Sequence, residues 1–559
     1  MSEYQPDNPL IVQGDHTVLV EVASPRYEEA RDRLVGFAEL EKSPEHIHTY
    51  RVTPLSVWNA CAAGMECEEM IGALQEFSKY PVPDHVLTRI RDYASRYGRL
   101  VISGEDGALR LEADEVALAE EISRESEVAP LLQERVAEAA FRVHPLNRGR
   151  LKQALVKAGF PARDVAGYTE GETLEVSLLS TTESGMDFAL RPYQEAAADA
   201  FHAGGTELGG SGVVVLPCGA GKTVVGMAAM ERLQSSTLIL ATNITASRQW
   251  RSELLDKTSL TEDVVGLYNG AHKDIRPVTI ATYQIMTWRK DTDSDFKHLE
   301  LFDRRNWGLI IYDEVHLLPA PVFQVTAGLQ ARRRLGLTAT LVREDGREDD
   351  VFALIGPKKA DVPWKVLERQ GWIATATCRE VRLPLPEDTR MSYAVANRRR
   401  KFRIASENPL KADAVRQLLE AHSEDQALVI GLYVDQVRGL AKELGIPALT
   451  GSTSQNRREE LYAGFKSGEI KRMVVSKVAN FAVDLPDASV AIQVSGTFGS
   501  RQEEAQRLGR ILRPKEGRNQ AHFYSLVSRD TVEQEFALKR QLFLCEQGYS
   551  YEIVDAEEL

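Results

Sequence analysis

Short, continuous runs of apolar and β-branched residues recur along the chain, each followed by a segment with helical spacing. Runs of this kind are typical of strands buried on both faces of a parallel sheet, and their alternation with helices indicates βα units. The pattern occurs in residues 188–365 and again in residues 408–559, so we predict two successive parallel α/β lobes. The runs are GVVVLP (212–217), TLILAT (237–242), VTIAT (278–282), GLIIYD (308–313) and LGLTAT (335–340), then ALVIGLY, IPALT, MVVSK, VAIQVS and HFYSLV.

A glycine-rich segment, LPCGAGKT, follows the first run and precedes a helical stretch. This is the context of a phosphate-binding loop, in which glycines let backbone N–H groups surround phosphates at the start of a helix. Lys222 would supply a positive charge and Thr223 a hydroxyl ligand for Mg²⁺. Leu216 stands where the longer GxxxxGKT pattern has its first glycine. We predict that ATP and Mg²⁺ bind at Pro217, Cys218, Gly219, Ala220, Gly221, Lys222 and Thr223.

Two adjacent acids end the run GLIIYDEVH. In open α/β sheets, ligands bind at the carboxyl ends of the strands, so both carboxylates are expected at the nucleotide. Asp313 would hold Mg²⁺ through water, and Glu314 would orient and deprotonate the attacking water. His316 is expected either to bridge the nucleotide to the other lobe or to have a structural role.

An arginine-rich helical segment, QRLGRILR, occupies residues 506–513. Phosphoryl transfer spreads negative charge over the γ-phosphate, and an arginine from another lobe can stabilise that charge. We predict that Arg510 and Arg513 are arginine fingers from the second lobe and that Gln506 lies at the nucleotide.

Several weaker signals agree with this interpretation. Arg191 and Gln194, in LRPYQ, would recognise the adenine edge. Small polar residues at strand ends could hold the phosphates of a nucleic-acid strand laid across the sheet edges, and the run NRRRKFR adds positive charge. The candidates for this contact are Thr242, Thr282, Thr450, Ser476, Arg399, Arg400 and Lys401.

The formal net charge is −14, which is unusual for a protein that binds nucleic acid. Charge distribution matters more than the total, and residues 101–140 hold eleven acidic residues against three arginines. We interpret this as local basic tracks on an acidic body. The five cysteines include no CxxC pair, which argues against a zinc site or a disulfide framework. With no signal-peptide pattern and no long apolar run, we expect a cytoplasmic, nucleoid-associated protein without a membrane span.

The N-terminal third has a different pattern. Residues 1–125 contain short strand-like runs, three helical segments and a predicted hairpin, RLVIS–GEDG–ALRLEA, which is the outline of a winged helix. Residues 131–180 form a compact αβ unit, and STTESGMD is a plausible linker. The acidic balance favours a protein-facing or structural role over DNA contact in this region.

The ordered set LRPYQ, LPCGAGKT, DEVH, LTAT and QRLGRILR resembles a superfamily 2 helicase. Three further features narrow the resemblance to the XPB family: the triplet Arg343-Glu344-Asp345, SPEHIHTYRVT near the N-terminus, and FYSLVSRDTVE with KRQLFLCEQGYS near the C-terminus. The resemblance implies two RecA-like lobes and an ATP-dependent 3′-to-5′ DNA helicase or duplex translocase of nucleotide excision repair.

The resemblance also implies a domain order. We expect an XPB-type, winged-helix-like N-terminal domain, a damage-recognition-like domain, a first ATP-binding lobe, a connector with a basic thumb-like segment, and a second lobe. Their expected bounds are 1–125, 131–180, 188–365, 366–407 and 408–559, respectively.

The R-E-D triplet is associated in the family with DNA opening. Arg343 is therefore the candidate wedge, with Glu344 and Asp345 repelling a strand or holding Arg343 in place. The implied partners are forked or duplex DNA of any sequence and a repair nuclease, with the motor acting as a monomer. Ala479 departs from the glycine common in the family. The size resembles prokaryotic members, so TFIIH is not an expected partner.

Two alternative functions stay open at this stage. An RNA-stimulated helicase would use the same ATP site. An ATP-switched scaffold that binds DNA and a nuclease would use ATP without unwinding. Measuring whether DNA or RNA stimulates ATP hydrolysis distinguishes a DNA helicase from the RNA-stimulated helicase. Measuring strand displacement distinguishes a helicase from the scaffold.

Overall fold

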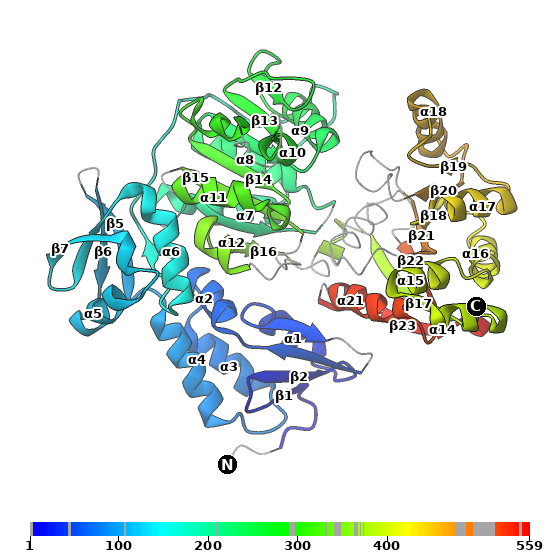
Figure 1. The fold of residues 1–559 in the computed structure, drawn as a ribbon, viewed down its shortest axis with the longest axis horizontal. Helices are drawn as coiled ribbons and strands as arrows, with labels where there is room; N and C mark the ends of the chain where they lie inside the picture. Colours follow the sequence, from blue (N-terminus) through cyan, green and yellow to red (C-terminus); the bar gives the residue numbers. More distant parts are fainter. Residues whose placement is uncertain are drawn as a thin grey trace. The chain divides into compact units, whose positions relative to one another are not determined.

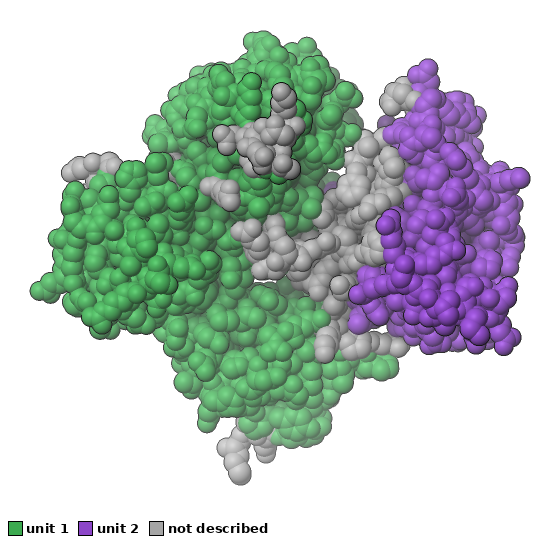
Figure 2. Space-filling view, in the orientation of Figure 1, with its two compact units in different colours: residues 1–41, 46–216, 221–361 green, residues 42–45, 217–220, 362–559 purple. Residues whose placement is uncertain are grey.

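The computed structural model describes most of the chain. Contact between segments divides it into two compact units: residues 1–41, 46–216 and 221–361, and residues 362–559 with the short pieces 42–45 and 217–220 (Figures 1 and 2). The described residues are 4–42, 46–105, 108–206, 209–217, 219–289, 297–329, 332–339, 348–362, 367, 368, 370–372, 374–476, 488–495, 520–546 and 551–559.

The first unit contains the first predicted lobe, a seven-stranded sheet in the order β12-β13-β11-β14-β15-β10-β16. Its neighbouring strands pair in parallel; for example, Val213 of β10 lies opposite Gly336 of β15. The strands are β10 (Ser211–Val215), β11 (Thr237–Ala241), β12 (Val265–Tyr268), β13 (Val278–Thr282), β14 (Leu309–Asp313), β15 (Arg333–Thr338) and β16 (Lys358–Asp361).

The five central strands of this sheet match the five predicted runs, because each is apolar on both faces. Strands β11 and β13 are buried at every position. Helices of the lobe pack against them, and Gly226 is needed where a Cβ would lie 2.6 Å from the Trp250 ring. The helices are α7 (Pro192–His202), α8 (Lys222–Leu233), α9 (Ile244–Lys257), α10 (Tyr283–Met286), α11 (Ala320–Gly328) and α12 (Glu348–Leu354).

The second unit holds another seven-stranded parallel sheet, in the order β19-β20-β18-β21-β22-β17-β23. The prediction of two RecA-like parallel-sheet lobes is therefore confirmed. The strands are β17 (Thr375–Leu383), β18 (Ala427–Gly431), β19 (Ala448–Leu449), β20 (Arg472–Ser476), β21 (Val490–Gln493), β22 (Gln520–Ser528) and β23 (Tyr551–Asp555).

Helices of the second unit surround this sheet. They are α14 (Glu387–Val395), α15 (Arg398–Ser406), α16 (Leu410–Ala421), α17 (Val434–Leu444), α18 (Gln455–Lys466) and α21 (Val532–Glu546). The expected connector, 366–407, contributes β17 to the sheet itself and then forms α14 and α15. Helix α15 is anchored by Phe402, whose ring lies 5.1 Å from that of Phe536.

The N-terminal region contains two antiparallel-rich sheets. The first has the order β1-β2-β4-β3 and the second the order β7-β8-β6-β5-β9. The first comprises β1 (Leu10–Val12), β2 (Thr17–Glu21), β3 (Glu39–Lys42) and β4 (Ile47–Arg51). Helix α1 (Tyr27–Leu34) connects β2 to β3, and α2 (Pro54–Ala62), α3 (Cys67–Phe77) and α4 (Asp84–Arg96) follow β4. The second comprises β5 (Leu100–Glu105), β6 (Ala108–Ala113), β7 (Leu132–Ala137), β8 (Ala140–Val143) and β9 (Arg163–Asp164), with α5 (Val116–Arg124) and α6 (Arg148–Lys157).

The predicted hairpin forms as β5 and β6, but it does not act as a wing on the three preceding helices. Strand β6 pairs with β8 and β5 with β9, so one sheet spans the expected boundary between residues 125 and 131. The reason is that Leu109 and Leu111 of β6 pack in one core with Phe141 and with Leu151 of α6. The αβ unit expected at 131–180 therefore includes the hairpin.

Helix α6 packs against the first lobe. The Gln153 side chain donates a hydrogen bond to Asp350 Oδ1 at 2.7 Å, and Gly149 lies so close to Ala327 that a Cβ would overlap its carbonyl oxygen. The base of α6 is held by Asp164, which pairs with Arg148 at 2.7 Å and Lys152 at 3.1 Å in a buried cluster. Among the helices of the described ranges, none is both long and apolar enough to cross a membrane.

Candidate nucleotide site

The phosphate-binding loop has the backbone that its glycines predict. Strand β10 ends at Val215, and α8 begins at Lys222 with Gly221 as its N-cap. Gly219 and Gly221 have φ values of 81° and 80°, in the left-handed region that glycine adopts without strain. A Cβ on Gly221 would also overlap the side-chain amide of Gln194. The loop therefore requires glycine for both conformation and space.

Lys222 and Glu314 meet at this site. Lys222 Nζ lies 3.2 Å from Glu314 Oε1, with both side chains largely buried. Glu314 Oε2 lies 3.6 Å from His316 Nδ1, which is also 2.6 Å from Thr338 Oγ1. The end of β14 thus brings the predicted base next to the lysine of the loop, and His316 links it to the end of β15.

Asp313 is held by residues from two other elements. Trp250 Nε1, on α9, donates to Asp313 Oδ2 at 3.0 Å, and the Tyr283 hydroxyl donates to the Asp313 carbonyl at 2.9 Å. Trp250 is only 2% exposed. The carboxylate of Asp313 therefore has one oxygen fixed by an N–H donor, as expected of a group that must present its other oxygen in a set direction.

The two acids have opposite electrostatic environments. Burial and the neighbouring Glu314 carboxylate raise the pKa of Asp313. Burial also opposes ionisation of Glu314, but the charges of Lys222 and His316 outweigh it and lower the pKa of Glu314. Glu314 therefore ionises at a lower pH than Asp313 in the nucleotide-free protein.

Glu314 also has an unusual backbone conformation. Its φ is 50°, in the left-handed region that residues other than glycine rarely adopt. Such conformations cost about 1–3 kcal/mol and concentrate at functional sites. Here the conformation separates the two consecutive acids. Asp313 is the last residue of the strand, and the Glu314 side chain pairs with Lys222.

Arg191 and Gln194 lie at the start of α7. The Gln194 side chain accepts a hydrogen bond from Arg191 N at 3.0 Å, and Arg191 Nη1 donates to the Tyr193 hydroxyl at 3.1 Å. Because the Gln194 amide also lies against Gly221, both residues adjoin the loop. Their predicted contact with adenine stays a prediction.

The predicted DNA contacts differ in exposure. Thr282 is 1% exposed, and its hydroxyl caps α10 by accepting from Ile285 N. In the second lobe Thr450 and Ser476 are buried. Thr242 is partly exposed and accepts from Asn243 Nδ2 at 3.2 Å, whereas Arg399 and Arg400 are exposed on α15, where Lys401 Nζ lies 5.4 Å from the Tyr393 ring centroid. The exposed cations are the strongest of these candidates on geometry.

Some predicted site residues lie outside the described residues. They are Cys218, Arg343, Glu344, Asp345, Gln506, Arg510 and Arg513, together with Ala479.

Sequence reasoning missed the supporting residues Trp250, Tyr283 and Thr338. Each lies beside small polar residues, in SRQW (247–250), ATYQ (281–284) and LTAT (337–340). For Trp250 and Tyr283 the large side chain was the available signal, but the partner Asp313 is 63 residues away from Trp250 and 30 residues away from Tyr283. Local spacing does not identify such partners.

The fold and the site together define a class: a two-lobed, RecA-like ATPase of the helicase type. Comparison with known families agrees. Residues 367–558 match the ERCC3/RAD25/XPB C-terminal helicase family, residues 187–343 match the res subunit of type III restriction enzymes, and residues 10–137 match a helicase conserved C-terminal domain.

Similarity to curated proteins gives the family. The chain is 55% identical to a protein of Kineococcus radiotolerans and to one of Mycobacterium tuberculosis, both named DNA 3'-5' helicase XPB. Each match covers 99% of this chain. It covers 97% of the Kineococcus protein and 99% of the Mycobacterium protein. It is 30% identical to the XPB/SSL2 helicase/translocase subunit of the general transcription and DNA repair factor IIH of Saccharomyces cerevisiae, over 97% of this chain and 72% of that one. The chain belongs to the XPB family of superfamily 2 DNA helicases.

Proposed function

We propose that this protein is an ATP-dependent 3'-5' DNA helicase or duplex translocase that opens DNA during repair. The observation that carries the proposal is the pairing of Lys222 with Glu314 at 3.2 Å beside a left-handed, glycine-dependent loop. In the nucleotide-free state the lysine neutralises the base. When the γ-phosphate competes for Lys222, Glu314 is released to accept a proton from water.

The donor set fits Mg²⁺ as the divalent metal. Thr223 supplies a hydroxyl in the first turn of α8, and Asp313 supplies a carboxylate whose orientation is fixed by Trp250. Oxygen donors of this kind, with the nucleotide phosphates, suit a metal that keeps several waters. When bound, the metal neutralises charge on the β- and γ-phosphates. Trp250 and Tyr283 orient Asp313 toward that task.

Movement along DNA follows from lobe closure. Arg510 and Arg513 of the second lobe would stabilise the triphosphate-bound state, and loss of the γ-phosphate would weaken that contact. Arg343, with Glu344 and Asp345, would pry strands apart. Arg399, Arg400 and Lys401 on α15 would hold the backbone of forked or duplex DNA without reading sequence. We further propose a repair nuclease as a partner, a monomeric motor, and action on the chromosome in the cytoplasm.

ATP hydrolysis with and without single-stranded, forked and blunt duplex DNA tests the proposal. Wild-type protein should be stimulated by DNA, and Lys222→Ala should lose about 10²–10⁴-fold of the rate, as expected when a positioned catalytic group is removed. Lys257→Ala, a lysine of α9 that pairs with Glu253 at 2.6 Å, is the matched control and should keep the rate. Equal hydrolysis by wild type and Lys222→Ala, or no stimulation by any DNA, would contradict the proposal.

A further inference from the structure

An aromatic cluster lies at the carboxyl edge of the first-lobe sheet. Strands β12 and β13 are parallel neighbours, so Tyr268 and Thr282 end them at the same edge. Thr282 caps the short helix α10, and Trp288 follows that helix by two residues. This is the sheet edge at which the strand-end threonines predict contact with nucleic acid.

The cluster presents one exposed ring, supported by a half-buried ring and a buried ring. Trp288 is 51% exposed, and its ring centroid lies 5.8 Å from that of His298. His298 in turn lies 5.6 Å from the Tyr268 ring, edge to face, and its Nδ1 is 2.8 Å from the Tyr268 hydroxyl. Tyr268 is only 7% exposed. The indole is thus backed by two rings that are fixed to β12.

Positive charge lies beside these rings. Lys273 Nζ is 4.7 Å from the Tyr268 ring centroid and donates to Asn269 O at 2.6 Å. Glu300, the nearest acid to His298 along its own segment, is paired with Arg304 at 2.8 Å. Burial, together with Lys273 and Lys297, lowers the pKa of His298, so its ring is neutral at pH 7. A neutral aromatic support between cations suits a base with flanking phosphates.

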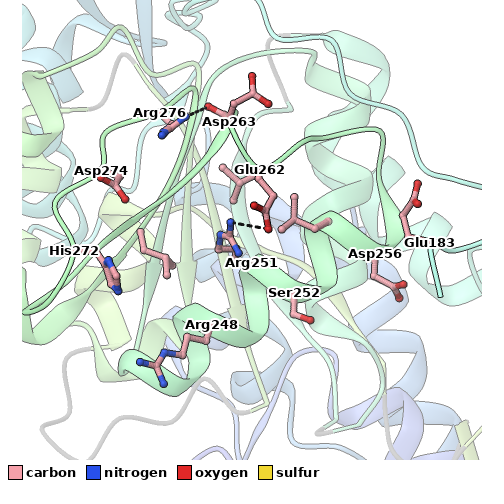
Figure 3. A pocket seen from close by; sticks show the side chains of 13 residues that line it. Glu183, Arg248, Arg251, Ser252, Asp256, Glu262, Asp263, His272, Asp274 and Arg276 are labelled. Carbon is pink, nitrogen blue, oxygen red and sulfur yellow. Dashed lines mark hydrogen bonds and ion pairs between the residues drawn. The ribbon is translucent and has the colours of Figure 1, made fainter.

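A pocket of mixed charge lies in the same lobe, lined by three arginines, one histidine and five carboxylates. It has a volume of about 940 Å³, lies between α9 and β12, and contains none of the loop residues or acids of the nucleotide site. Figure 3 shows Arg248 and His272 on one side of it, away from the Arg276–Asp263 contact. Among the side chains drawn, Arg248 is joined to no carboxylate. Arg248 lies in the first half of α9, and His272 follows β12, so both belong to the same sheet edge as Trp288.

We propose that Trp288 is a stacking platform for an unpaired base of DNA, with Lys273, beside the Tyr268 ring, contacting a neighbouring phosphate. Every base has a π-face, so stacking on an indole grips a single strand without reading its sequence. The platform would hold a strand just after it is separated. This inference rests on the proposed DNA helicase function and names the residue that binds the opened strand.

The test compares Trp288→Ala with Trp288→Phe, which keeps an aromatic face. Dissociation constants are measured by fluorescence anisotropy at one salt concentration for a labelled single strand, the same strand with abasic sites, and a blunt duplex. Stacking contributes about 1–3 kcal/mol per base, so Trp288→Ala should bind the intact strand roughly 5- to 100-fold more weakly. Its affinities for the abasic strand and the blunt duplex should match those of wild type, and Trp288→Phe should keep most of the affinity for the intact strand.

Two results would overturn the inference: unchanged binding of the intact strand by Trp288→Ala, or an equal loss on all three DNAs. ATP hydrolysis by the wild type separates this failure from failure of the helicase proposal. If DNA stimulates ATP hydrolysis by the wild type but Trp288→Ala binds the intact strand as wild type does, only the stacking proposal is contradicted. If DNA does not stimulate ATP hydrolysis, the proposed helicase function, on which the stacking proposal rests, is contradicted.

Discussion

The residues of the nucleotide site constrain one another by charge and by hydrogen bonds. Glu314 stays ionised because Lys222 and His316 offset its burial, whereas Asp313 has a raised pKa and depends on its donors for orientation. The Asp313 carboxylate accepts a side-chain hydrogen bond from Trp250 and a backbone hydrogen bond from Glu314. We therefore propose that Trp250 is a positioning residue for Asp313, the predicted metal ligand.

Trp250→Phe tests that role. Phenylalanine keeps a ring against Gly226 but lacks the Nε1 donor. Loss of a supporting hydrogen bond to a metal ligand typically costs 10–100-fold in metal affinity or activity, so the Mg²⁺ concentration for half-maximal ATP hydrolysis should rise by roughly that factor. Mg²⁺ titrations of hydrolysis measure it. An unchanged Mg²⁺ requirement with reduced melting temperature would mean that Trp250 acts through packing alone.

A second residue-scale prediction concerns pH. His48 on β4 is 4% exposed, and burial, with Arg31 nearby, lowers its pKa to about 4. The unfolded chain gains a proton near pH 6.5 while the folded chain does not, so stability is lost as pH falls from about 6.5 to 4. The linked loss is roughly 3 kcal/mol.

Amide hydrogen exchange of the β4 and α1 peptides, corrected for intrinsic rates, measures this loss. His48→Gln removes the titrating group and should flatten the pH dependence between pH 6.5 and 4. His85, which is exposed and bonded to Gly14 O at 2.9 Å, gives the control substitution His85→Gln. The same acid dependence in wild type and His48→Gln would assign the loss to other groups.

At the scale of elements, α6 joins the five-stranded sheet to the first lobe. Gly149→Ala would push a Cβ into the carbonyl oxygen of Ala327 on α11 and should destabilise the protein by about 1–3 kcal/mol, as overpacking does. Gly72→Ala is the matched control, since Gly72 also lies within a helix but has open space around it. That change should stabilise by about 0.5–1 kcal/mol. Urea unfolding gives the free energy of unfolding of both variants. Equal changes in that free energy would mean that α6 can shift on α11 without cost.

The elements also show what the sequence could predict. The central strands of both lobes were identified because burial on both faces leaves an uninterrupted apolar run, as in β13. Strand β16, with Lys358 and Lys359, was missed because an edge strand needs no such run. Strand β17 was missed because its polar residues alternate with apolar ones, so its segment was assigned to the connector between the lobes. The β5–β6 hairpin was found, but its sheet was not, because β8 pairs with it from about thirty residues further along the chain.

The same distinction applies to the site. Lys222 and Glu314 were predicted because the loop and the strand end are local patterns with known chemistry. The contact of His316 with Thr338 and that of Trp250 with Asp313 depend on how helices and strands pack. No spacing rule within one segment contains that information.

At the scale of the whole molecule, we propose an ATP site in the first lobe and DNA contacts at sheet edges and on α15. The body is acidic, with a net charge of −14, so DNA must bind on local basic surfaces. Affinity should therefore fall steeply with salt. Membership of the XPB family and the intact pairing of Lys222 with Glu314 favour a working motor over a scaffold that uses ATP only as a switch.

Strand displacement on forked DNA distinguishes a 3′-to-5′ motor from a protein that uses ATP only as a switch. Two forks, one with only a 3′ single-stranded tail and one with only a 5′ tail, are incubated with wild-type protein, ATP and Mg²⁺, with Glu314→Gln as the hydrolysis-deficient control. We predict that wild type displaces the strand of the 3′-tailed fork, that it leaves the 5′-tailed fork intact, and that Glu314→Gln binds both without opening either. Displacement of the 5′-tailed fork alone, or equal opening by Glu314→Gln, would contradict it.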